Sequence, residues 1–489
     1  MTIPATRLLL AALLAGISGD YLLRGNVNWR LGFAVWITIV VVIAMVLDRE
    51  GGRERRFLLA GIAAAAFGLV LRDAQLLYAV DFGSLLAMGI LTIWHGSGRR
   101  LADLTVVEGA RAGILAAVNT IAGAVGVVSR TSAERSAGAD SGRARALLVG
   151  VVLAVPPLLV VTGLLAASDK VFEHLLDTVG KSLAADTIGH LLVILLVAWI
   201  TAGWFRAATG NTLGASVPAP ASPGLRFASV AVPLYSLVAL LSLFLLTQAR
   251  VLFGGAAFLR ETAGLTVANY AREGFFQLIL ASVIVLGTLV VAEWLMNRTD
   301  APSRRHFHIA GAILLALVMT LLVSAATRIG IYVGLFGHSM DRMFAMAAIV
   351  FVLAVLVTCG LTTLRGRPGR FAPSVVGVAI GWVVVLNLMN PEALVVRANV
   401  ARAQAGAEFD VAYHAALSAD ALPVLVSQSH RLAAADCRSV GEAARLSWHG
   451  RSESYWVSGF TWRGLSVPLL RASRWYRGGG IIPCAAAPG

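Results

Sequence analysis

Apolar runs of about 20 residues recur along the chain as far as Asn390, and short polar segments separate them. A helix of about 20 apolar residues crosses the hydrocarbon core of a bilayer, so each run is long enough to span a membrane. The alternating ten-residue segments of a membrane β-barrel are not seen. The pattern predicts eleven spans, at 7–23, 31–47, 57–71, 75–94, 146–166, 186–205, 228–247, 275–296, 307–327, 343–363 and 373–390.

Two segments depart from this pattern. In 104–128, the polar residues Glu108, Arg111 and Asn119 stand among Leu, Ile and Val, which is typical of an amphipathic helix on the membrane surface. Residues 391–489 follow the last apolar run and carry two short helical patterns, the second interrupted at Pro423. The predicted fold is all-α: a polytopic helical bundle of about 11 transmembrane helices over 1–390, and a small extramembrane C-terminal module over 391–489.

Composition agrees with a membrane protein. The chain is 58% hydrophobic and 13% charged, and its mean hydropathy is +0.79. Its net charge of +14 does not indicate nucleic-acid binding, because the basic residues are scattered between spans rather than gathered on one soluble face. Nearly all of them are arginines, and with so much Ala, Gly and Val this composition is typical of a GC-rich bacterial source.

The distribution of Arg and Lys predicts the orientation of the bundle. The loops on the side of the N-terminus carry 20 of these residues, and the loops on the other side carry 10 before the tail begins. Because cytoplasmic loops retain Lys and Arg, we expect a bacterial inner-membrane protein with a cytoplasmic N-terminus. An odd number of spans then places residues 391–489 outside.

Polar side chains mark the entry to the span 275–296. Asn269, Tyr270, Glu273 and Gln277 form one helical stripe, with Arg272 beside it. Ionisable groups at membrane depth usually face a cavity or a protein partner, so the stripe predicts an outward-facing polar recess. The alternative is a structural cap that anchors the helix at the lipid headgroups.

Three further residues are candidates for the same recess. Asp81 lies within a predicted span and would relay protons, bind a cation or pair with an Arg from a neighbouring helix. Arg328 and Tyr332 are four residues apart in the predicted loop 328–342, where they would hold an anionic group or simply extend toward the headgroups.

Enzymatic chemistry has little support. The histidines show no metal-binding spacing, the chain has no nucleophile-elbow, phosphate-loop or dinucleotide motif, and we therefore assign no catalytic, metal or cofactor site. With the tail in an oxidising compartment, Cys437 and Cys484 are candidates for a disulfide, while Cys359 lies in a span. Trp448, Trp456 and Trp462 indicate either a membrane-interface or partner-binding surface, or the aromatic core of a small domain.

Five segments resemble a known family. They are "LLVVTGLLAASDKVFEHLL", "GLTVANYAREGFFQL", "RIGIYVGLFGHSMDRMFA", "NPEALVVRANVARA" and "FDVAYHAALSADALPVL". In this order they resemble the bacterial membrane-protein family filed as domain of unknown function 4173 and its 4153-type relatives, although "GHSMDR" departs from the family's usual turn. The resemblance implies a polytopic bacterial inner-membrane protein and brings no activity with it.

Two functions are compatible with these observations. The first is transport of a small solute, ion or lipid through a site on the outer side. The second is a non-transporting sensor or scaffold of the cell envelope, which binds a protein partner through its outer loops and tail. Inverted repeats with broken spans would favour transport. The bilayer is the partner common to both functions.

Overall fold

Helices make up almost all of the computed structural model, which describes residues 3–24, 29–48, 51–135, 183–210, 212, 225, 227–263, 275–296, 301–457, 462–482 and 484. Nine helices in these ranges are long and apolar enough to cross a membrane. They are α1 (Ala5–Leu23), α2 (Arg30–Leu47), α4 (Gln75–Gly96), α8 (Leu183–Ala208), α9 (Phe227–Ala263), α11 (Phe275–Leu295), α12 (Ala301–Phe336), α13 (Met340–Thr362) and α14 (Phe371–Met389). The chain is therefore an all-helical, multi-pass membrane protein.

Two of the eleven predicted spans are not among these nine. The span 57–71 is helical, as part of α3 (Arg53–Leu71), but α3 begins with four charged residues and its apolar part is short. It packs against α2, α4 and α14. The other span, 146–166, lies outside the described residues.

The helix α5 (Val106–Arg135) covers the segment predicted to be amphipathic and does not meet the criteria for a span. It has two distinct faces. Glu108 and Asn119 are buried, whereas Ile114 and Ile121 are more than 60% exposed. An exposed apolar face is what a helix in contact with lipid requires.

The prediction of a loop at 328–342 is wrong. The helix α12 continues to Phe336, only residues 337–339 form the turn, and α13 begins at Met340. Likewise α9 runs on to Ala263, 16 residues beyond the predicted span 228–247. Neither segment contains a Pro, and apolar residues follow the polar positions in both, so the helical backbone continues past the predicted ends of the spans.

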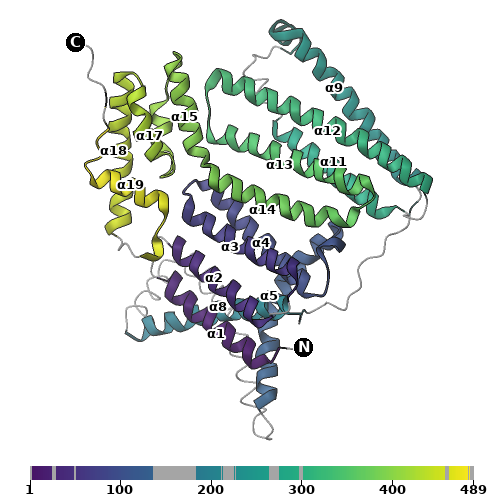
Figure 1. Ribbon diagram of the computed structural model, residues 1–489, viewed down its shortest axis with the longest axis vertical. Coiled ribbons are helices and arrows are strands. Elements are labelled where there is room, and N and C mark those ends of the chain that lie inside the picture. Colours follow the sequence, from purple (N-terminus) through teal and green to yellow (C-terminus); the bar gives the residue numbers. More distant parts are fainter. Residues whose placement is uncertain are drawn as a thin grey trace, which may run out of the picture.

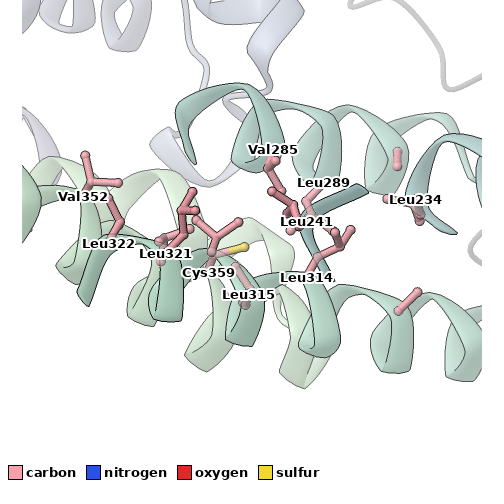
Figure 2. Close-up of a cluster of buried hydrophobic side chains, with 14 of the residues drawn as sticks. Leu234, Leu241, Val285, Leu289, Leu314, Leu315, Leu321, Leu322, Val352 and Cys359 are labelled. Carbon is pink, nitrogen blue, oxygen red and sulfur yellow. The ribbon is translucent and has the colours of Figure 1, made fainter. Parts of the chain in front are cut away.

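One half of the bundle is built from α9, α11, α12 and α13. Leu234, Leu289, Leu314 and Leu322 are almost fully buried where these helices meet, and Cys359 of α13 lies in the same cluster (Figure 2). Lipid provides no hydrophobic driving force between helices, so close side-chain packing of this kind is what holds them together.

The other half contains α1, α2, α3, α4, α5 and α8, and it uses small residues for close approach. A Cβ at Gly16 of α1 would lie 2.5 Å from the carbonyl oxygen of Ile194 in α8, and one at Gly203 would lie 2.2 Å from the oxygen of Thr120 in α5. Glycine therefore lets these backbones touch. Helix α14 contacts α3 and α4 on one side and α13 on the other, so it joins the two halves (Figure 1).

The bundle has two ends, which we name from the chain. At the N-terminal end lie the end of α2, the start of α3, and the segments 97–105 and 363–370; there the Leu101 amide donates to Glu54 Oε2 over 3.1 Å. At the tail end lie the turns 72–74 and 337–339, and Asn390. Asn390 adopts a left-handed conformation (φ 50°) that ends α14, and its side chain accepts a hydrogen bond from the Ala393 amide at the start of the next helix.

The C-terminal helices lie beyond the tail end of the bundle (Figure 1). They are α15 (Pro391–Gln404), α16 (Val411–Ala416), α17 (Leu422–Gln428), α18 (Ala434–Val457) and α19 (Val467–Arg477). The sequence suggested that Pro423 interrupts a helix, but it does not. The helix α16 ends before Leu417, and Pro423 lies in the first turn of α17, where a proline costs no hydrogen bond.

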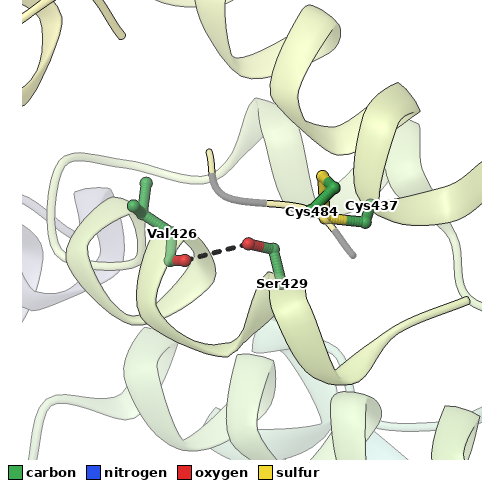
Figure 3. Close-up of a disulfide and its surroundings, with 4 residues drawn as sticks. All are labelled: Val426, Ser429, Cys437 and Cys484. Atoms are coloured by element: carbon green, nitrogen blue, oxygen red, sulfur yellow. Dashed lines mark hydrogen bonds between the residues drawn. A yellow bond between two sulfur atoms is a disulfide. The ribbon is translucent and has the colours of Figure 1, made fainter. Parts of the chain in front are cut away.

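The C-terminal helices have apolar clusters of their own. Val396, Val400, Leu425 and Val440 are nearly inaccessible to solvent in one of them. Cys437 and Cys484 border this cluster and form a disulfide, with Cα atoms 5.8 Å apart (Figure 3). The bond ties the end of the chain to α18. Of the three tail tryptophans, Trp462 is 46% exposed; the side chains of Trp448 and Trp456 lie outside the described residues.

Candidate functional site

The turn between α12 and α13 lies against the C-terminal helices at the tail end. Gly337 has a φ of +80°, and a Cβ there would lie 2.9 Å from the side-chain oxygen of Asn399 in α15. Only glycine combines this backbone conformation with so close a neighbour. The turn and α15 are therefore in direct contact.

Two arginines donate hydrogen bonds to the carbonyl groups at the C-terminus of α12. Arg402 of α15 donates to the carbonyl oxygens of Val333 and Gly334, the second over 2.8 Å. Arg342 of α13 donates to Phe336 O over 3.1 Å and lies 4.3 Å above the ring of Tyr332. The last carbonyl groups of a helix lack partners within it and carry negative partial charge, so guanidinium groups stabilise this end.

Asn399 links the turn to a buried histidine. Its side-chain oxygen accepts from the His338 amide over 2.8 Å, and its NH2 group donates to His338 O and to His414 Nε2, over 2.8 and 2.9 Å. Because Nε2 accepts, the proton of His414 is on Nδ1, which donates to Asp410 O over 2.6 Å. The ring of His414 also stacks on Phe409, with centroids 4.2 Å apart.

A recess of about 810 Å³ lies between these two parts of the chain. Its chemically distinctive lining residues are His338, Arg342, Asn399, Arg402, Glu408 and His414. Tyr413 also lines it, and its hydroxyl accepts from the Met340 amide over 2.8 Å. A ligand in the recess would therefore meet two guanidinium groups, carboxylates of Glu408 and Asp410, and two imidazoles.

Burial sets the charge of the two imidazoles. It lowers the pKa of His338, which the charges of Arg402 and Arg342 lower further. Burial also lowers the pKa of His414. Both rings are therefore neutral at physiological pH, where they act as hydrogen-bonding groups rather than as cations.

The structure places only part of the predicted polar recess. Asn269, Tyr270, Arg272 and Glu273 lie outside the described residues, so their grouping stays a prediction; Gln277 is exposed on α11.

Arg328 and Tyr332 lie on α12 and not in a loop. Arg328 is 7% exposed and does not line the recess described above, whereas Tyr332 packs against Arg342 and Phe336 at its edge.

Asp81 is fully buried within α4 and pairs with an amide rather than with an arginine. Asn387 of α14 donates from Nδ2 to Asp81 Oδ1 over 2.8 Å. The arginine next to the span, Arg72, reaches the opposite way: it donates to the carbonyl oxygens of Asn387 and Leu388 and forms an ion pair with Asp420 at 3.4 Å. Of the alternatives for Asp81, pairing with an arginine is therefore not what the structure shows; its partner is Asn387.

A second polar group fixes the C-terminal helices to the tail end. Asp420 Oδ2 accepts from the amides of Asp73 and Ala74, and Asp73 Oδ2 accepts from the Ala419 amide over 3.0 Å. Arg30 of α2 forms an ion pair with Asp73 at 2.5 Å. Together with the arginine pair at Asp420, these contacts hold the start of α17 on the turn between α3 and α4.

Glu392 lies beside this group. It is 4% exposed and accepts two hydrogen bonds from Ser418, over 3.0 Å from the amide and 2.6 Å from the hydroxyl. Burial raises the pKa of Glu392 to about 7; the Ser418 hydrogen bonds oppose this, and the charges of Asp420 and Asp73 add to it. Burial also raises the pKa of Asp420.

Sequence reasoning did not single out Asn399, Arg402, Glu392 or Asp420. Each lies in the segments "NPEALVVRANVARA" and "FDVAYHAALSADALPVL" that carried the family resemblance. The one available signal was their polar character beside apolar residues. Nothing in the local sequence says that Asn399 and Arg402 meet residues more than 60 positions away, or that Asp420 meets the turn between α3 and α4.

An all-helical bundle with many apolar spans, and a polar recess at one end, defines the class: this is a multi-pass integral membrane protein. The chain belongs to the family described as domain of unknown function (DUF4153), which matches residues 8–428. This is the 4153-type group that the sequence resemblance had placed beside 4173. The match covers the recess and the Asp73–Asp420 contact and ends before the disulfide. No curated protein and no solved structure matches the chain.

Proposed function

We propose that this protein senses a small polar solute or a lipid headgroup in the cell envelope by binding it in the recess at the tail end. The observation that carries the proposal is the position of the recess. One wall is the turn between two membrane helices, and the other is α15 with the segment that leads into α16. A ligand that contacts both walls would strengthen their contact, and so shift the population of docked C-terminal helices.

The lining supports a ligand with both an anionic group and hydrogen-bond donors. Arg342 and Arg402 suit a carboxylate or phosphate, whereas Glu408 and the neutral His338 suit a donor. Phe409 offers an apolar ring beside these groups. A zwitterionic solute and a phospholipid headgroup share this chemistry.

The asymmetry of Arg and Lys supports an outward-facing recess. The loops of the N-terminal end carry twice as many of these residues as those of the tail end, which favours a cytoplasmic N-terminal end. In a bacterial inner membrane, the recess would then open to the periplasm. The ligand would come from outside the cell or from the outer leaflet.

Transport is the second candidate, because an ionisable side chain lies within the bundle. Asp81 is fully buried between membrane helices, and such residues often mark the path of an ion or substrate. Transport and sensing differ in one measurable property. A transporter moves the bound ligand across a sealed membrane, and a sensor does not.

Native mass spectrometry of the protein extracted from its own membranes tests the binding proposal. We expect a bound small molecule or lipid, with occupancy reduced at least several-fold in Glu408→Gln. Glu408 lines the recess and is exposed, so its replacement should not disturb the fold. The control is Glu442→Gln, which removes an exposed carboxylate on α18 that does not line the recess.

Two results would contradict this proposal. One is the absence of any adduct, together with no rise in melting temperature for a panel of amino acids, phosphate esters and headgroup analogues. The other is equal loss of the adduct in both variants. Flux of the identified ligand into proteoliposomes would show that the protein is a transporter rather than a sensor.

A further inference from the structure

Two oxygen atoms without a hydrogen-bond partner belong to one pair of side chains, which joins two helices far apart in the sequence. Asp81 Oδ2 and Asn387 Oδ1 are both inaccessible to solvent and have no hydrogen-bond partner in the described part of the chain. Their residues are 0% and 4% exposed and already share one hydrogen bond. A buried acceptor without a donor is unfavourable, because it loses its hydrogen bonds to water and gains none in return, and two in one pair call for an explanation.

The orientation of the Asn387 amide is fixed by its neighbours. The atom within 2.8 Å of Asp81 Oδ1 is also 3.0 Å from the carbonyl oxygen of Val383. Both neighbours accept hydrogen bonds, so this atom must be the NH2 group. Turning the amide round would place two acceptors against its oxygen, and therefore cannot supply the missing donor.

No cation in the described residues compensates a charge on Asp81. The groups that face it are Gly68 of α3 and Asn387 of α14, and a Cβ at Gly68 would lie 2.6 Å from Asp81 Oδ2. The charged residues at this end of the bundle are engaged elsewhere: Arg30 pairs with Asp73, which also accepts from Tyr78, and Arg72 pairs with Asp420. An ionised carboxylate in this place would stand without a counter-charge among apolar helices.

We propose that Asp81 and Asn387 form a proton-binding site inside the bundle, with the proton on Asp81 Oδ2. A single proton removes the charge and supplies the missing donor. The resulting O–H serves the bare oxygen of Asn387, because a carboxylic acid and a carboxamide pair through two hydrogen bonds. The proton comes from water and returns to it, with no other reactant. This site is independent of any ligand in the recess.

The pair is coupled to the docking of the C-terminal helices. Arg72 donates from its backbone amide to Gly68 O over 3.1 Å and from Nε to Asn387 O, so it touches both neighbours of Asp81. It is therefore a cation that the loss of the proton would attract. Its ion pair with Asp420 would weaken in that event, because one guanidinium cannot serve both carboxylates.

Infrared spectroscopy of the full-length protein in lipid tests the site. At neutral pH, the difference between wild type and Asp81→Asn should contain the stretching band of a protonated carboxyl group, and this band should shift in D2O. Asparagine reproduces the shape and the hydrogen bonds of the neutral pair, so this variant should keep the wild-type melting temperature. The control, Asp341→Asn, removes an exposed carboxylate and should show no such band.

A second variant keeps the proposal testable if Asp81→Asn does not fold. In Asn387→Leu the side-chain partner is lost, while the backbone oxygen that Arg72 contacts remains. The carboxyl band should then move to the higher frequency of an acid without a hydrogen bond. Absence of a protonated-carboxyl band from wild type at neutral pH overturns the proposal, and so does a band that neither variant alters.

Discussion

Asp73 and Asp420 form a reciprocal contact, in which each carboxylate accepts hydrogen bonds from backbone amides at or next to the other residue. The carboxylate of Asp420 accepts from the amides of Asp73 and Ala74, and the carboxylate of Asp73 accepts from the amide of Ala419. The two residues are 347 positions apart in the chain. This reciprocal contact joins the turn between α3 and α4 to the start of α17, so the C-terminal helices and the bundle share one buried polar joint.

Replacing Asp420 by Leu should loosen this joint. Leucine cannot accept hydrogen bonds, so the change leaves two backbone amides without an acceptor, at a cost of about 2–4 kcal/mol. Hydrogen exchange at Asp73 and Ala74 should accelerate strongly. The control, Asp436→Leu, lies half-exposed on α18 and should change the melting temperature little. Unchanged exchange at Asp73 and Ala74 would show that the contact does not hold the C-terminal helices.

Glu392→Gln should alter the pH dependence of stability. Burial raises the pKa of Glu392 from its ordinary value of 4.5 to about 7, so the uncharged form is the one that folding favours. Its contribution is fully present below pH 4.5 and is lost as the pH rises through about 7. Glutamine is uncharged throughout. The melting temperature of Glu392→Gln should therefore fall less than that of wild type between these pH limits. Identical slopes of melting temperature against pH would refute the raised pKa of Glu392.

His414 should produce an acid-side effect of opposite sign. Burial lowers its pKa below the ordinary value of 6.5, so its contribution is present above pH 6.5 and is lost as the pH falls through the folded-state value. Protonation would also turn Nε2 into a donor facing the NH2 group of Asn399. His414→Asn should therefore show a shallower loss of melting temperature below neutral pH. A slope as steep as that of wild type would exclude His414 as the cause.

Reduction of the Cys437–Cys484 disulfide should destabilise the C-terminal helices. The bond joins residues 47 positions apart, and opening a loop of this size costs roughly 3–4 kcal/mol in the chain-entropy model. Limited proteolysis after mild reduction should cut the end of the chain first. Cys359→Ala, which removes the buried free cysteine, should leave this susceptibility unchanged. Equal protease resistance before and after reduction would contradict the prediction.

The arginine asymmetry makes a separate prediction about orientation. A reporter fused after Gly489 should be active only if it functions outside the cytoplasm, because the tail end is expected to face outward. A matching fusion to the N-terminus should show the opposite behaviour. Activity of a cytoplasm-only reporter at the C-terminus would reverse the assignment of the two ends, and with it the side from which the recess is reached.

The apolar periodicity of the sequence was sufficient to predict a multi-pass helical membrane protein. It located the helices because a bilayer requires about 20 apolar residues per span whatever the neighbours are. It was less reliable at the helix ends. The helix α12 extends nine residues beyond the predicted span 307–327, because the helical backbone continues through Arg328 and apolar residues follow it.

The sequence also identified Asp81 as unusual, because a carboxylate within an apolar run is costly wherever the helix packs. Only the tertiary structure gave Asp81 its partner, Asn387, which lies 306 positions away. The recess likewise depends on contacts between α15 and a turn formed much earlier in the chain. Hydrophobic length is a local property that the residues themselves carry, whereas the pairing of polar groups depends on which helices pack together, and no local pattern encodes that.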